Sequence, residues 1–169
     1  MLIVATIQLY GISVSMNLAV NLPMKLSEID NKTLLVKTQE LARSEREVTL
    51  SVLHHLREIE RRHLYAELGY SSLYEYVVQE LKYSNGAAHR RIASMRLLNT
   101  LPEMEKKLES GALSLCALAQ AQSFFRQEKT QSLEVKKSIL LNLENKSTRE
   151  VERELLSSSS QPERLMPEN

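Results

Sequence analysis

Apolar residues recur every three or four positions along most of the chain after residue 27. This spacing is typical of helices that bury one face. Serine, or proline in a first turn, opens most of these segments and supplies their start signals. No run of alternating β-branched residues predicts a strand of five residues or more between Ser27 and Leu156. The fold class is therefore all-α, a compact multi-helix domain with helices over 28–43, 44–63, 73–81, 85–98, 102–110, from 115, 132–143 and 147–156.

A pair of short helices stands at the centre of this pattern. Ser72 is placed to cap the first helix, and Glu75 three residues later completes a capping box. Lys82 and Tyr83 form the predicted turn, after which Ser84 caps the second helix. This order is close to the helix-turn-helix of DNA-binding proteins, whose second helix enters the major groove N-terminus first.

The second helix of this pair and the turn before it carry several basic residues. The chain has no acidic residue between Leu81 and Pro102 to offset their charge. A local basic excess favours phosphate contacts. Asn85 and His89, near the N-terminus of the helix, are the candidates for base edges, and Ser94 is also expected to point outward. The predicted partner is double-stranded DNA, and the DNA-contacting residues are Lys82, Ser84, Asn85, His89, Arg90, Arg91 and Arg96. The alternative is a helix pair that serves packing alone.

The two neighbouring arginines of this helix have different expected roles. Residues next to each other in a helix point about 100° apart. Arg91 flanks the predicted buried face and is placed to pair with Glu75 or Glu80 of the preceding helix. Arg90 lies farther from that face, and we expect it to be the better phosphate contact.

The two ends of the chain differ from the helical part. Residues 1–26 form an N-terminal arm, in which no residue up to Met24 is charged. We interpret this arm either as the result of a translation start assigned too early or as a weak membrane anchor. Polar residues and Gly11 interrupt its apolar run, so we do not expect it to span a membrane. Residues 157–169, which begin with four serines, are expected to be a disordered tail. The helical domain is then residues 27–156.

Composition narrows the function classes. The net charge is +1, so any role with DNA depends on a local basic patch. The single cysteine, Cys116, excludes an internal disulfide, suits a reducing cytoplasm and is expected to be a small buried side chain.

Candidate catalytic chemistry is sparse. His55 and His63 are too far apart to form a His-x-x-x-His zinc pair, and the chain has no HExxH motif and no second cysteine. Cys116 and His89 have no evident third group to orient them. We therefore expect no metal, no cofactor and no cleavage of DNA by this chain alone.

Several motifs occur in order at spacings that carry a family resemblance. They are EREVTLSVLHHLREI at 45–59, RHLYAELGYSSLYEY at 62–76, LKYSNGAAHRRI at 81–92, LSL at 113–115 and STREVER at 147–153. Together they resemble the helical N-terminal domain that precedes HNH endonuclease modules in some bacteria. The resemblance covers about residues 27–156. In that family a metal-dependent nuclease follows this domain. No residue here matches its catalytic centre, so no catalytic residue is carried over.

Three functions remain open. The first is a DNA-binding module that keeps the helical part of an HNH protein. The second is a protein-interaction or dimerisation module, with a homodimer formed through the helix at 44–63. The third is a fragment of an HNH endonuclease that needs a partner.

Overall fold

The computed structural model describes residues 5–9, 12–16, 25–130 and 132–159. Two compact units divide the chain, residues 1–40 and residues 41–169. Helix α1, Asn31–Arg62, begins in the first unit and continues into the second.

The first unit contains a β-hairpin where the uncharged arm was expected. Strand β1, Ala5–Leu9, pairs antiparallel with β2, Ile12–Met16, in a register that joins Leu9 to Ile12. A short 3₁₀ turn, Leu26–Glu28, precedes α1. The amide N–H of Thr33 donates to Asp30 Oδ1 over 3.0 Å, and hydrogen bonds from the Thr33 side chain and from this amide lower the pKa of that carboxyl. Asp30 therefore caps α1, and the helix begins at Asn31, three residues after the expected start at residue 28.

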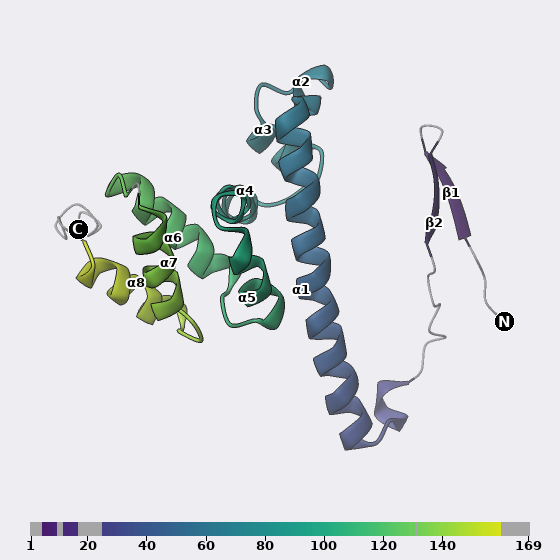
Figure 1. The fold of residues 1–169 in the computed structure, drawn as a ribbon. Helices are drawn as coiled ribbons and strands as arrows, with labels where there is room; N and C mark the ends of the chain where they lie inside the picture. Colours follow the sequence, from purple (N-terminus) through teal and green to yellow (C-terminus); the bar gives the residue numbers. More distant parts are fainter. Residues whose placement is uncertain (1–4, 10–11, 17–24, 131, 160–169) are drawn as a thin grey trace. The chain divides into compact units, whose positions relative to one another are not determined.

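The second unit is built from helices, as the sequence predicted (Figure 1). No strand occurs among the described residues between 27 and 156, so the all-α prediction for this part is confirmed. After α1 the helices are α2 Leu64–Glu67, α3 Leu73–Gln79, α4 Asn85–Thr100, α5 Glu105–Ser110 with a 3₁₀ turn Pro102–Met104 before it, α6 Leu115–Gln127, α7 Leu133–Asn142 and α8 Thr148–Ser157. Residues 160–169 of the expected disordered tail lie outside the described residues.

Helix α1 is one helix of 32 residues, so the predicted break at Ser44 is wrong. The segment from 31 to 62 contains neither glycine nor proline, and nothing in it stops a helix once formed. Arg43 Nε donates to Glu47 Oε1 over 3.0 Å, one turn later, directly across the expected boundary. Ser44 followed by Glu47 is therefore a capping-box pattern that the structure does not use as a cap.

Substitution of two serines distinguishes a true cap from a false one. Ser147 accepts the Glu150 N–H while Glu150 accepts the Ser147 N–H, the capping box that the sequence predicted. We expect Ser147→Ala to lower the free energy of unfolding by about 1 kcal/mol. Ser44→Ala, inside an exposed stretch of helix, should leave it unchanged or raise it by up to about 0.5 kcal/mol. Urea unfolding of both variants measures the two changes in the free energy of unfolding. Equal decreases for the two variants would indicate that Ser44 also caps a helix.

Helix α4 lies at the centre of the second unit, because it packs against α3 on one side and α6 on the other. Helices α7 and α8 pack in turn against α6 (Figure 1). The fully buried side chains include Leu97 of α4, Leu118 of α6, Leu140 of α7 and Val151 of α8. This arrangement buries most of α4 and leaves its N-terminal turns at the surface.

Polar contacts attach α1 to α5. His54 Nε2 lies 2.9 Å from Glu105 Oε1, and Arg46 Nε donates to the Glu109 carbonyl over 3.0 Å. Gly111, with φ of 85°, ends α5 in the left-handed region that favours glycine. The Arg46 guanidinium lies 3.4 Å from where a Cβ of residue 111 would be, which is ordinary van der Waals contact, so the positive φ and not a lack of space favours glycine here.

Candidate functional site

The helix pair α3–α4 is capped largely as the sequence predicted. Ser72 accepts the Glu75 N–H, and Ser84 accepts the Ala87 N–H. The Glu75 carboxylate, however, accepts the backbone N–H and hydroxyl of Ser71 instead of closing a box on Ser72. These hydrogen bonds lower the pKa of Glu75.

The connection between α3 and α4 is longer than the predicted two-residue turn. It runs from Glu80 to Ser84, and Lys82 adopts a left-handed conformation with φ of 59°. The Tyr83 N–H returns to the Val77 carbonyl over 3.2 Å and closes the turn. Leu81 lies beyond the end of α3 and is 38% exposed.

The exposed residues of α4 gather mainly in its first two turns. Lys82, Ser84, Asn85, His89 and Arg90 are exposed, as expected. From Ile92 onward only Arg96, Asn99 and Thr100 are exposed, and the other residues of the helix are buried.

Ser94 is the exception to the predicted outward set. Its side chain is fully buried, and its hydroxyl donates to the Leu115 carbonyl at the start of α6 over 3.0 Å. The outward prediction for Ser94 is therefore wrong. A small side chain is needed here because α4 and α6 pack directly against each other.

Arg91 contacts an aromatic ring instead of a carboxylate. Its guanidinium lies 4.0 Å from the centroid of the Tyr83 ring, and Nη1 donates to the Ala87 carbonyl over 3.3 Å. The expected acceptors already have donors: Glu75 binds Ser71, and Glu80 accepts the Tyr70 hydroxyl over 2.6 Å. The hydrogen bond to Glu80 raises the pKa of Tyr70. Arg91 therefore holds the α3–α4 turn against α4.

Arg96 is ion-paired within the chain. Its Nη2 donates to Glu60 Oε1 over 2.6 Å, which links α4 to α1. The guanidinium stays about half exposed. A phosphate at this position would compete with Glu60 for Arg96, whereas none of the described residues forms an ion pair with Lys82 or Arg90.

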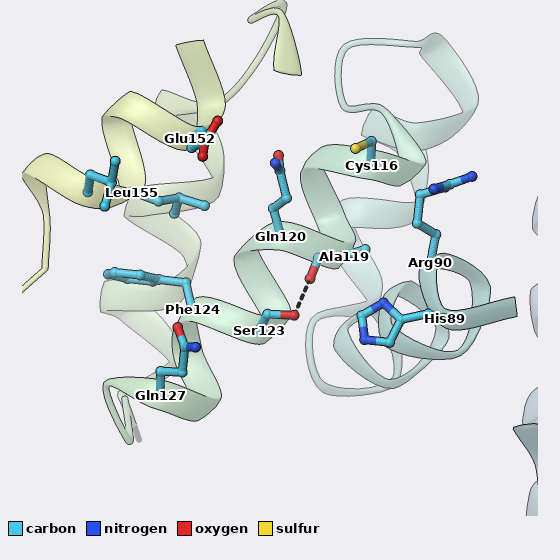
Figure 2. Close-up of a pocket in the computed structure, with 11 residues that line it drawn as sticks. His89, Arg90, Cys116, Ala119, Gln120, Ser123, Phe124, Gln127, Glu152 and Leu155 are labelled. Carbon is cyan, nitrogen blue, oxygen red and sulfur yellow. Dashed lines mark hydrogen bonds between the residues drawn. The ribbon is translucent and has the colours of Figure 1, made fainter. Parts of the chain in front are cut away.

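A groove opens beside the exposed start of α4 (Figure 2). His89 and Arg90 of α4 line one side of it, Gln120 and Phe124 of α6 form its floor, and Leu155 of α8 faces them across the groove. Its volume is about 270 Å³. Gln120 Oε1 is buried there and has no hydrogen-bond partner among the described residues.

The α6 and α8 side of this groove was missed by sequence reasoning. Gln120, Ser123 and Gln127 follow each other at helical spacing in α6. Polar residues at this spacing indicate that one face of α6 is not packed in the core. The sequence does not indicate which other helix lies across the groove from that face.

A second hollow of about 260 Å³ lies on the other side of His89. Arg96 and Arg126 line it together with Glu60, and Tyr65 and Tyr74 add aromatic surface. His89 thus lies between two hollows, with Arg90 in one of them and Arg96 and Arg126 in the other.

The groups available for catalysis are not organised as a catalytic site. Cys116 is half-buried and lines the same groove as His89, but within the described part of the chain no hydrogen bond orients either side chain. Across those same residues, no group of three or more His, Cys, Asp or Glu side chains is placed to hold a metal ion.

Comparison with known proteins does not assign this chain to a family. A scan of protein-family models and searches of curated proteins and of solved structures found no match to this chain. Among the described helices, none is both long enough and apolar enough to cross a membrane.

Proposed function

We propose that the second unit binds double-stranded DNA through the exposed start of α4. The observation that carries this proposal is the pair of exposed cations at one helix N-terminus, Lys82 and Arg90, with His89 exposed beside them and without a carboxylate anywhere from residue 81 to residue 102. Phosphates are attracted both by such cations and by the free amides of a helix N-terminus. The resemblance to the helical domain of HNH endonucleases agrees with this function and is part of the proposal.

The structure divides the basic residues by what else they contact. Lys82 and Arg90 are assigned to phosphates, and Asn85 and His89 to base edges. Arg91 stacks on the Tyr83 ring and Arg96 forms an ion pair with Glu60. We therefore assign both arginines to holding α4 in position and not to contacting DNA. Ser84 contributes as the cap of α4.

The test is a titration of the full chain with duplex DNA at about 50 and 200 mM salt. We expect Arg90→Ala to weaken binding several-fold and to flatten the salt dependence by about one unit, because one phosphate contact is lost. Arg149→Ala, which removes the same charge from an exposed position in α8, should change neither quantity.

Two outcomes would contradict the proposal. One is an affinity for Arg90→Ala equal to that of the unchanged chain at both salt concentrations. The other is an equal loss for Arg149→Ala, which would show attraction to net charge without a site. Thermal unfolding of each variant, expected to be unchanged because both side chains are exposed, controls for loss of fold.

A further inference from the structure

The second hollow beside His89 lies entirely within the second unit. We call it the Arg126 hollow, and the residues that line it include Glu60, Tyr65, Leu73, His89, Arg96 and Arg126. They come from five helices, α1, α2, α3, α4 and α6. Its volume is about 260 Å³, slightly below the range of about 300–1,000 Å³ that is typical of ligand pockets. A ligand that fits this hollow is therefore a small molecule.

Positive charge prevails among the side chains that line the Arg126 hollow. Arg96 reaches it from α4 and Arg126 from α6, whereas Glu60 is the one carboxylate among the described lining residues. Arg126 is exposed and forms no ion pair with any residue in the described part of the chain. Its guanidinium is therefore available to an anionic ligand.

The ion pair between Arg96 and Glu60 leaves donors of Arg96 unused. Nη2 of Arg96 donates to Glu60 Oε1, and this guanidinium forms no other hydrogen bond with a described residue. A guanidinium has five N–H donors, and the Arg96 side chain is 49% exposed. Arg96 is therefore able to donate to a second acceptor, although Glu60 competes for it.

Apolar surface adjoins these charges in the same hollow. Leu73 and Ile92 line it and are only 3% and 6% exposed, so they belong to the core. Tyr65 packs partly against that core, and Tyr74 is 41% exposed. An aromatic ring beside these two tyrosines would bury apolar surface and could pack against their rings.

We propose that the Arg126 hollow binds a small phosphate monoester that carries an aromatic group. Arg126 and Arg96 donate to the phosphate, and the aromatic group lies against Tyr65 and Tyr74. A phosphate has three terminal oxygens that point in different directions, so it accepts from guanidiniums of two helices at once. The two oxygens of a carboxylate lie in one plane and are satisfied by a single guanidinium.

This site is separate from the surface proposed for DNA. Arg90 lines the groove on the other side of His89 and is not among the residues that line the Arg126 hollow. Lys82 and Asn85, also assigned to DNA, line neither of the two. Binding of the phosphate monoester therefore does not depend on the residues that the DNA titration tests.

Isothermal titration calorimetry of the full chain at low salt tests the proposal, with phenyl phosphate as the probe. At about pH 7 a phosphate monoester carries a charge of about −1.5 to −2. Inorganic phosphate lacks the ring and phenol lacks the charge, so each should bind at least about fivefold more weakly than phenyl phosphate. Benzoate, which keeps the ring but carries a carboxylate, should also bind more weakly.

Three substitutions test which side chains contact the probe. Arg126→Gln should weaken the binding of phenyl phosphate by about tenfold, because a charge-assisted hydrogen bond is lost. Glu60→Gln should strengthen it several-fold, because the change removes a like charge and frees Arg96. Arg149→Gln, which removes the same charge as Arg126→Gln from an exposed position in α8, is the matched control and should leave the affinity unchanged. Thermal unfolding without the probe checks that each variant is folded.

Amide chemical shifts measured by NMR give the position of the bound probe. We expect phenyl phosphate to change the shifts of residues 72–74, 92–96 and 122–126, which line the Arg126 hollow or adjoin its lining. Changes confined to residues 116–120 and 152–156 would place the probe in the other groove and overturn the proposal.

Four further results would also overturn the proposal. They are no binding of phenyl phosphate, benzoate binding as tight as that of phenyl phosphate, an Arg126→Gln variant no weaker than Arg149→Gln, and a Glu60→Gln variant that binds no more tightly than the unchanged chain. None of these measurements uses DNA, so this proposal and the proposed function fail separately.

Discussion

Leu140→Ala should lower the free energy of unfolding by about 2–5 kcal/mol, whereas Leu141→Ala, at the next position, should lower it by about 0.5 kcal/mol. Leu140 is fully buried in the core, and its truncation loses transfer free energy and leaves a cavity. Leu141 is 43% exposed, so the same chemical change removes far less buried surface.

Urea unfolding of the two variants checks this prediction, with the denaturant dependence compared to confirm that the same surface is exposed on unfolding. The two substitutions remove the same atoms from the same helix, so their difference reports burial alone. Similar losses at both positions would show that α7 faces the core in a different rotation from the one in the structure.

The same two residues show what the sequence determines about a helix and what it does not. The run from Leu133 to Leu143 predicts a helix because its start at Ser132 and its apolar content are clear. Three consecutive apolar residues, Ile139 to Leu141, do not say which of them faces the core. That choice is made by the helix against which α7 packs, and the sequence of α7 does not contain it.

The local start signals lie close to the observed helix starts at four serines. Ser84, Ser114, Ser132 and Ser147 each cap a helix, and each stands two or three residues after a residue with positive φ. Ser44 carries an equally good local pattern, but the backbone before it stays helical. A capping motif therefore starts a helix here only where the preceding backbone has already left the helical conformation.

The sequence predicted which single residues of the site are exposed, but it did not predict which residues contact each other. Exposure of Asn85, His89 and Arg90 follows from the period of α4 and is observed. The partners of Arg91 and Arg96 are not encoded in that period. Tyr83 meets Arg91 because the connection after α3 turns back, and Glu60 meets Arg96 because α1 reaches past α4.

Ser94→Leu should lower the free energy of unfolding by about 1–3 kcal/mol, because the larger side chain does not fit between α4 and α6. Ser94 is fully buried and its hydroxyl donates to the Leu115 carbonyl, so the substitution also removes that hydrogen bond. Ser94→Ala removes the hydrogen bond without adding volume and should cost about 1 kcal/mol.

Asn99→Leu is the matched control, since Asn99 is exposed on the same helix and the change adds a leucine there. It should change the free energy of unfolding by no more than about 0.5 kcal/mol. The helical period alone places Ser94 outward and predicts that Ser94→Leu behaves like Asn99→Leu. Denaturant unfolding of the three variants decides between these expectations. A Ser94→Leu variant as stable as Asn99→Leu would mean that α4 and α6 do not pack closely at this position, and that α4 presents more of its length to a partner than its first two turns.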